Sequence, residues 1–194
     1  MIEFPLTIKG SRIELITLEP TFDNARLVFD TVVENREHLL PWLTWSSIER
    51  TNKPEDSFEF LLKNKQKREE HIKYSFGIFL NDKYIGNVGI FDISEKKKSA
   101  EIVYWLIKEA VGKGYISEAV KLIEDEAFSN LGLNRIQIRC DVRNTASANV
   151  AKRLGYKLDG TMRSFNFNRV ENIFVDCYIF SKLKLEWEVE GKKE

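Results

Sequence analysis

Apolar residues recur along this chain with two spacings, every second position or every third and fourth, which are typical of strands and of amphipathic helices. Residues 12–18 alternate and predict a strand, whereas apolar positions from about 116 to 131 follow the helical spacing. Pro54 predicts a helix start, because proline suits the first helical turn. The expected elements are a strand at 12–18, helices at about 22–35 and from 54 onward, strands at 74–80, 84–93 and 100–107, a helix at 116–131, a strand at 135–141, a helix at 144–154, and strands at about 157–168 and 172–183.

No internal repeat or linker interrupts this order of elements. Runs of strands with helices between them favour one α+β domain, in which helices cover a mixed, mostly antiparallel sheet. We therefore expect a central sheet of about six to seven strands flanked by about four helices. The domain is predicted to span residues 1–185, and the charged residues 186–194 are predicted to form a tail that frays.

The composition favours a globular protein and excludes several classes of partner. Of 194 residues, 43% are hydrophobic, enough to bury a large core. The 30 basic and 30 acidic residues leave a net charge of zero, so no overall field attracts nucleic acid or an anionic membrane. Two cysteines and two histidines fit neither a disulfide framework nor a metal site, and no stretch approaches a membrane span. The prediction is a cytoplasmic protein, monomeric or homodimeric, with no metal and no nucleic-acid or membrane partner.

The segment 111–116, Val-Gly-Lys-Gly-Tyr-Ile, lies between an expected strand and an expected helix. In such a turn, unpaired backbone N–H groups and the positive end of the helix dipole converge, which favours a phosphate group. Gly112 and Gly114 would let the backbone approach the anion closely. The spacing matches neither the P-loop nor the dinucleotide fingerprint, and a plain tight turn is the alternative.

Further segments place this turn in a family context. Residues 101–106 read EIVYWL, residues 112–115 read GKGY, and residues 141–156 read DVRNTASANVAKRLGY. Together with residues 35–45, NREHLLPWLTW, they resemble the GNAT family of acetyl-CoA-dependent N-acetyltransferases, and best its RimJ and RimL branch of ribosomal-protein N-terminal acetyltransferases. The resemblance extends over most of the chain, from about residue 10 to residue 183.

The resemblance implies where acetyl-CoA would bind. Its pyrophosphate would meet the glycine turn, and its pantetheine arm would pair with the end of the preceding strand. Val111 and Ile116 depart from the polar and small residues usual in the family's turn, so binding is expected to depend on the backbone amides and on Lys113. The implied cofactor-binding residues are Trp105, Leu106, Ile107, Gly112, Lys113, Gly114, Tyr115, Ile116, Ser117 and Asn144.

Acetyl transfer from a thioester to an amine requires a neutral amine, a stabilised oxyanion and a proton for the leaving thiolate. About a tenth of an α-amino group is neutral at pH 7, against less than about a thousandth of a lysine side chain, so an α-amine needs only a modest base. Glu101, an acid within an apolar strand, is the candidate base, and the resemblance supports it. A solvent-facing glutamate on a half-exposed strand is the alternative.

The resemblance also implies which group protonates the leaving thiolate. Many family members use a tyrosine seven residues after the motif asparagine, but here that position is Ala151. Ser147, three residues after Asn144, is the expected substitute, and Asn144 would contact the pantetheine arm. Helix capping by Asn144 and an ordinary first-turn position for Ser147 are the alternatives. Neither cysteine lies in these motifs, so we expect direct transfer without a covalent intermediate.

Trp42 and Trp45 lie in a proline-containing segment that is too aromatic for an ordinary surface loop, and they are predicted to wall the acceptor pocket, unless one of them fills the core. The sequence therefore predicts an N-acetyltransferase acting on an α-amino group of a protein or peptide, such as a ribosomal protein. The alternatives are a small-molecule N-acetyltransferase, acting on a polyamine, an amino-sugar or a peptide antibiotic, and a non-catalytic coenzyme A-binding module. Several carboxylates in the acceptor pocket would favour a polycation.

Overall fold

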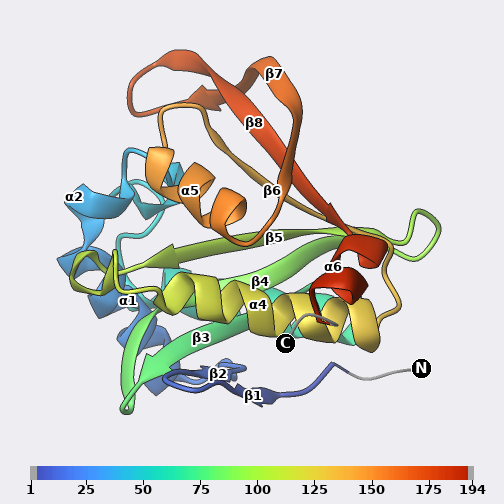
Figure 1. Cartoon of the computed structure of the whole chain (residues 1–194). Coiled ribbons are helices and arrows are strands. Elements are labelled where there is room, and N and C mark those ends of the chain that lie inside the picture. Colours follow the sequence, from blue (N-terminus) through green and yellow to red (C-terminus); the bar gives the residue numbers. More distant parts are fainter. Residues whose placement is uncertain (1–3, 192–194) are drawn as a thin grey trace.

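The computed structural model describes residues 4–191, which form one mixed sheet with helices on both faces (Figure 1). No helix among these residues has the length and apolar character needed to cross a bilayer. The strands are β1 (Thr7–Lys9), β2 (Glu14–Ile16), β3 (Tyr74–Leu80), β4 (Lys83–Ser94), β5 (Ser99–Leu106), β6 (Arg135–Asp141), β7 (Lys157–Asn168) and β8 (Ile173–Leu183). The helices are α1 (Phe22–Glu34), α2 (Arg36–Leu39), α3 (Pro54–Glu69), α4 (Tyr115–Ser129), α5 (Thr145–Arg153) and α6 (Lys184–Glu190), with two 3₁₀ helices, η1 (Thr44–Ser46) and η2 (Lys108–Ala110).

The strands lie in the order β1-β2-β3-β4-β5-β6-β8-β7, and β5 with β6 is the parallel pair within this otherwise antiparallel sheet. This parallel pairing is short, because only residues 99–101 pair with residues 135–137. Beyond these residues the two strands diverge, as Figure 1 shows in the middle of the sheet. The divergence leaves one edge of β5 and one edge of β6 without a strand partner.

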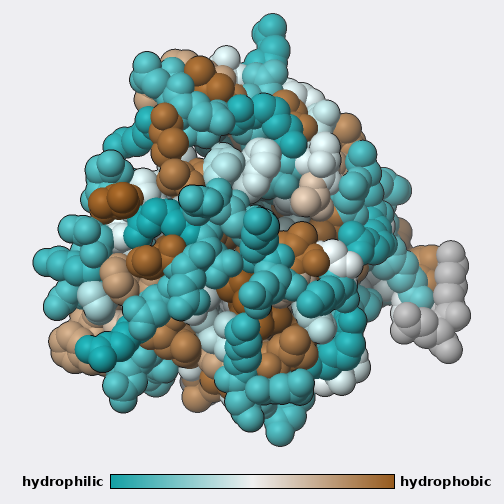
Figure 2. Space-filling model, turned by 90° about the vertical axis from the view of Figure 1, so that its left-hand side faces the viewer, coloured by the Kyte–Doolittle hydropathy of each residue, from teal (hydrophilic) through white to brown (hydrophobic). Residues whose placement is uncertain are grey.

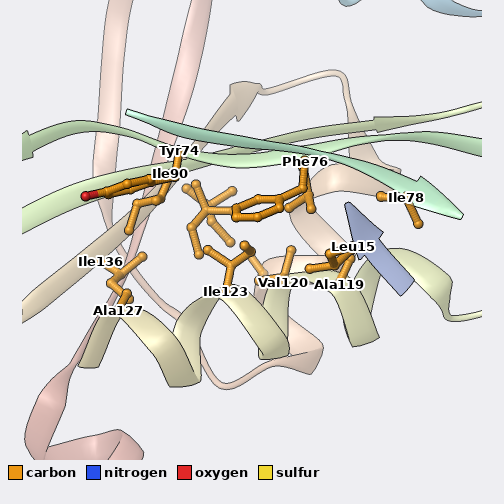
Figure 3. Packing of buried hydrophobic residues seen from close by; sticks show 14 of the residues in the cluster. Leu15, Tyr74, Phe76, Ile78, Ile90, Ala119, Val120, Ile123, Ala127 and Ile136 are labelled. Atoms are coloured by element: carbon orange, nitrogen blue, oxygen red, sulfur yellow. The ribbon is translucent and has the colours of Figure 1, made fainter. Parts of the chain in front are cut away.

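The main core lies between α4 and one face of the sheet. Ala119, Val120, Ile123 and Ala127 recur at helical spacing and are buried against strand residues such as Phe76 (Figure 3). The strands contribute every second side chain, because successive residues point to opposite faces. Burial of each large apolar side chain contributes roughly 1.5–3 kcal/mol. This packing fixes the start of α4, and with it the glycine turn, next to the end of β5.

A second, smaller cluster lies on the opposite face of the sheet. Val32 of α1 and Leu39 of α2 are buried there with Tyr84 of β4, and Trp45 and Trp105 pack against them. Because Trp105 belongs to β5, this cluster holds α2 beside the end of that strand. The two clusters therefore bring α2 and α4 together at one end of the sheet.

The fold is α+β as predicted, with more elements than expected. The sheet has eight strands, slightly more than the six to seven predicted, because the three-residue edge strand β1 was not expected. Residues 4–191 contain six α-helices, whereas about four were predicted. The unexpected helices are α2, with four residues, and α6, with seven. Elements this short show too few turns or alternations to be detected from apolar spacing.

The prediction that the chain frays from residue 186 is wrong for the described part of the tail. α6 spans Lys184–Glu190, so the expected domain boundary after residue 185 falls inside a helix. Trp187 Nε1 donates a 2.6 Å hydrogen bond to Asp125 of α4, and Lys182 of β8 contacts Glu190 at 2.6 Å. These contacts anchor the helix to the domain. Residues 192–194 of the predicted tail lie outside the described residues.

Candidate functional site

A cavity of about 370 Å³ opens where β5 and β6 diverge. Its walls come from α2 and the loop after it, from the diverging strands, from the turn before α4, and from α5. The side of the molecule that carries α2 and the start of α4 shows apolar patches between hydrophilic side chains (Figure 2). The cavity thus joins segments that lie more than a hundred residues apart in the sequence, from His38 to Arg153.

The turn before α4 presents backbone donors to this cavity. Gly112 and Gly114 have φ of +80° and +84°, in the left-handed region that favours glycine, and Gly114 is the N-cap of α4. The first N–H groups of a helix have no intrahelical partner, so this turn offers donors together with the positive end of the dipole. Ser117 also lines the cavity, and its buried Oγ has no hydrogen-bond partner among the described residues. These donors fit the oxygens of a pyrophosphate.

Arg12, which the sequence did not mark as a site residue, holds this turn in place. Its Nη1 donates to the Lys113 carbonyl at 2.9 Å, its Nε donates to Glu118 at 2.8 Å, and its guanidinium lies 5.0 Å from the Tyr115 ring. Burial acts to raise the pKa of Glu118, but the bonds from Arg12 and from Ser11 outweigh it and hold that pKa below its usual value. No local pattern could reveal this contact, because about a hundred residues separate Arg12 from the turn.

The diverging strands form the long walls of the cavity. Trp105 and Leu106 line it from β5, and Ile138 and Cys140 line it from β6. Backbone N–H and C=O groups of a strand alternate in direction, so those of β5 that point toward β6 lack a strand partner beyond residue 101. An extended amide-containing chain could pair with them, as was predicted for pantetheine. Ile107 is buried in the core and lies outside the lining.

The start of α5 places Ser147 beside β5. The Asn144 side chain caps this helix by accepting a 3.0 Å hydrogen bond from the Ser147 backbone N–H, which confirms the capping alternative for Asn144. The Ser147 hydroxyl lies 3.0 Å from the Tyr104 hydroxyl, and both residues line the cavity. Burial raises the pKa of Tyr104, so its phenol keeps its proton near neutral pH. Tyr104 was missed as a site residue, although it directly precedes Trp105 on the strand that was expected to pair with pantetheine.

Cys140 lines the cavity, although no cysteine was predicted at the site. Burial raises the pKa of its thiol to about 11, with a smaller opposing effect from the Ser147 hydroxyl. The thiolate is the nucleophilic form of cysteine, and this environment disfavours it near neutral pH. Cys140 and Cys177 are both free and buried. No group of three or more histidine, cysteine or acidic side chains in residues 4–191 is arranged to hold a metal ion.

Glu101 lies at the point where β5 and β6 separate, but it does not line the cavity. It is only 6% exposed, which excludes the solvent-facing alternative. Its Oε2 accepts a 2.6 Å bond from Arg139 Nε and a 3.0 Å bond from Gln137 Nε2. Arg139 does line the cavity, and its guanidinium lies 5.0 Å from the Phe165 ring of β7. Glu101 is therefore the ion-pair partner of a cavity residue.

The segment of residues 35–45 forms the wall of the cavity on the side of α2. Trp42 lines the cavity and is 41% exposed, whereas Trp45 lies outside the lining. The Trp45 ring packs 6.1 Å from the Trp105 ring in the second cluster. Of the two tryptophans, Trp45 therefore fills the core and Trp42 faces the cavity. His38, one turn before Trp42, lines the cavity as well.

The cavity brings together most of the residues that the sequence singled out. Four of them lie outside its lining, namely Glu101, Ile107, Lys113 and Trp45. Lys113 contributes a carbonyl to the Arg12 contact, and its side chain does not face the cavity. The predicted residues that line the cavity are Trp42, Trp105, Leu106, Gly112, Gly114, Tyr115, Ile116, Ser117, Asn144 and Ser147.

Comparison with known proteins identifies the family of this chain. Residues 12–157 match the acetyltransferase (GNAT) domain family. The uncharacterized N-acetyltransferase p20 of Bacillus licheniformis is 33% identical over 115 residues, which cover 59% of this chain and 64% of that relative. The putative ribosomal N-acetyltransferase YdaF of Bacillus subtilis (strain 168) is 27% identical over 182 residues, which cover 93% of this chain and 96% of that protein.

A solved structure shares the fold along nearly the whole chain. RimL, a ribosomal L7/L12 alpha-N-protein acetyltransferase solved in complex with coenzyme A, superposes with a TM-score of 0.83 at 21% identity, over 92% of this chain and 96% of that chain. At this identity the likeness concerns the fold alone. The family match covers most of the described residues. The chain therefore belongs to the GNAT family of N-acetyltransferases, with acetyl-CoA as its acetyl donor.

Proposed function

We propose that this N-acetyltransferase transfers acetyl directly from acetyl-CoA to the α-amino group of a protein or peptide. The observation that carries the proposal is the charge of the cavity. Its charged or ionisable lining includes His38, Arg139 and Arg153, and no aspartate or glutamate among the described residues lines it. A polyamine or an amino-sugar carries several ammonium groups, and binding them in a cavity without carboxylates would leave those charges unpaired. An acceptor with a single reactive amine avoids this cost.

The names of two similar proteins support a protein acceptor. YdaF is named a putative ribosomal N-acetyltransferase, and RimL is a ribosomal L7/L12 alpha-N-protein acetyltransferase. Both are similar to this chain over more than nine-tenths of its length. A ribosomal protein is therefore the acceptor class that we propose first. A cytoplasmic location is consistent with the two free thiols.

The positions of the residues support specific roles. The glycine turn and Ser117 would hold the pyrophosphate, and the free edge of β5 would pair with the pantetheine amides. Ser147 would give its hydroxyl proton to the leaving thiolate. The Tyr104 hydroxyl, 3.0 Å away, would donate to the serine oxygen as that proton leaves. If Glu101 acts as the base, a water must bridge its carboxylate to the amine. Glu101 itself does not line the cavity, and it is bound to Arg139, which does.

A panel of acceptors tests the proposal. The protein is incubated with acetyl-CoA and one acceptor at a time, and products are scored by mass spectrometry. The acceptors are peptides with a free α-amine and acetylated lysines, the same peptides with a blocked α-amine and free lysines, spermidine, and an amino-sugar. Acetylation of the free α-amine peptides supports the proposal. Faster acetylation of spermidine or the amino-sugar would overturn it in favour of a small-molecule acceptor.

A further inference from the structure

A base for the acceptor amine must reach the cavity and must be able to gain a proton near neutral pH. The ionisable lining residues of the described chain are His38, Tyr104, Tyr115, Arg139, Cys140 and Arg153. Arginine stays protonated in proteins, and tyrosine and cysteine carry their protons near neutral pH in the absence of an activating partner. Burial raises the pKa of Tyr104 and of Cys140, so these two side chains hold their protons more firmly still. Within the lining, only the His38 imidazole is left to accept a proton.

Backbone and side-chain contacts hold His38 at the end of β5. The His38 backbone N–H donates to the Asn35 carbonyl, and the Asn35 side chain accepts a 2.9 Å hydrogen bond from the Lys108 backbone N–H. These bonds tie the start of α2 to η2, directly after β5. The next residue, Leu39, is 3% exposed and anchors α2 in the second cluster. The backbone of His38 is therefore held in place by the Asn35 contacts before it and by the burial of Leu39 after it.

The imidazole lies close to the Leu106 backbone, which acts to raise its pKa, as a carbonyl beside a ring N–H does. A ring N–H that donates to a carbonyl fixes the tautomer, and the other ring nitrogen then carries the lone pair. Leu106 lines the cavity together with His38. A neutral imidazole that turns its N–H toward a carbonyl has its lone pair on the other nitrogen, which is the form that a general base requires.

Burial and, to a smaller extent, the nearby Lys108 favour the neutral form of the ring. Burial is the main cause that lowers the pKa of His38 below 6.5, and Lys108 lowers it further, while the Leu106 backbone acts in the opposite direction. Arg36 and Glu37 are the charged neighbours on α2, and Arg36 is directed to the Ser46 and Thr51 carbonyls. Arg139 and Arg153 are the other cations of the cavity lining. Since the pKa lies below 6.5, the ring is mostly neutral at pH 7.

We propose that His38 is the general base of the acetyl transfer, an inference that rests on the proposed function because it requires an amine acceptor. The amine nitrogen bonds to the thioester carbonyl carbon, and the carbonyl π electrons move to oxygen. The nitrogen loses its proton to the free His38 nitrogen. The oxyanion electrons then re-form the C=O bond as the carbon–sulfur bond breaks, its electron pair stays on sulfur, and the thiolate takes the Ser147 proton. The proton held by His38 returns to the serine oxygen through solvent. Glu101 is a positioning residue that holds Arg139 in the cavity wall.

Three variants test this assignment with an acceptor peptide that has a free N-terminal serine and no free lysine. We expect His38→Gln to lower kcat at pH 7 by about 100-fold, within the usual range for loss of a general base, and to leave the KM for acetyl-CoA unchanged. His71→Gln is the matched control, because His71 bonds to Tyr74 and lies outside the cavity. We expect a smaller loss for Glu101→Gln. Loss of activity in Glu101→Gln with full activity in His38→Gln would overturn the inference.

The pH dependence of kcat gives a second readout that misfolding would not mimic. Below its pKa the ring binds a proton and has no lone pair, so the wild-type kcat should fall as the pH drops through a value below 6.5. This acidic limb should be missing from the residual activity of His38→Gln and unchanged in His71→Gln. Persistence of the limb in His38→Gln would contradict the assignment.

Proton NMR separates this inference from the proposed function. The chain has two histidines, so the His71→Gln variant assigns the remaining imidazole signal to His38. A titration should give a His38 pKa below 6.5. A pKa above 7 would overturn the base role even if every peptide in the acceptor panel is acetylated. If no amine is acetylated by the wild type, the proposed function fails, and the base role fails with it regardless of the titration.

Discussion

Tyr104 Oη and Ser147 Oγ lie 3.0 Å apart and join β5 to the start of α5 on the cavity wall. Either hydroxyl can be the donor. The Tyr104 hydroxyl also lies 3.3 Å from the Ser147 carbonyl oxygen, so the tyrosine has two acceptors on one residue. A serine gives up its proton more readily when a neighbouring donor stabilises the oxygen it leaves. This geometry supports the proposal that the pair acts together as the proton donor to the leaving thiolate, with the tyrosine supplied by the strand that lines the cavity.

The first prediction concerns this pair. Ser147→Ala should lower kcat by about 10²-fold, because general acid catalysis typically contributes that much, while acetyl-CoA affinity stays nearly intact. Tyr104→Phe keeps the ring and removes only the hydroxyl, so we expect a smaller fall in kcat. Steady-state kinetics and calorimetry with acetyl-CoA give the two quantities. An unchanged kcat in Ser147→Ala would remove the role of this serine and leave the acetyltransferase activity itself in place.

The second prediction concerns the glycine turn. Gly114→Ala places a Cβ on a residue at φ +84°, which costs about 1–2 kcal/mol of unfolding free energy. It should also weaken acetyl-CoA binding, because the amides at the start of α4 shift. Gly132→Ala is the matched control: its φ is +61°, and it lies outside the cavity lining. Chemical denaturation and calorimetry should show a similar stability loss in both variants and an affinity loss in Gly114→Ala alone. Equal affinities would argue against phosphate binding at this turn.

The third prediction concerns the buried ion pair that anchors the C-terminal part of the chain. Lys182 Nζ lies 3.0 Å from Glu124 Oε1, and the two side chains are 1% and 0% exposed. Lys182→Met leaves Glu124 buried without its partner, so we expect the free energy of unfolding to fall by about 3–5 kcal/mol. The double variant Lys182→Met with Glu124→Leu removes both charges and should recover most of this loss. Urea denaturation measures both, and a stable single variant would contradict the prediction.

The long elements of the fold could be predicted from the sequence because their apolar periodicity is strong. The helix beginning after Gly114 and the strand of residues 135–141 are both present close to their expected bounds. The prediction was wrong near the C-terminus, where the high density of charged residues from Glu186 onward indicated a fraying tail but the structure has a helix. Trp187 anchors this segment through a bond to Asp125, 62 residues earlier. The apolar spacing of a seven-residue helix carries too little information to reveal such a contact.

The site could be predicted in part. Asn144 and Ser147 both line the cavity because they are neighbours at the start of one helix. Gly112 and Gly114 both line it because they belong to one turn. Glu101 was correctly placed on a strand but not at the cavity surface. Its partner Arg139 follows 38 residues later, on a strand that becomes its neighbour only when the sheet forms. A role that depends on a residue so distant in the sequence cannot be recognised from the residues around Glu101.

The sequence by itself determined the family, the order of the long elements and the segments that line the cavity, because these follow from local periodicity and from motifs within single segments. The tertiary structure decided which side chains of those segments face the cavity. Trp42 faces it and Trp45 fills the core, although three positions separate them. His38 lines it and Glu101 does not. The physical reason is that the cavity exists only because β5 and β6 diverge after three residue pairs, and that packing against the sheet decides which side chains of the other segments face it.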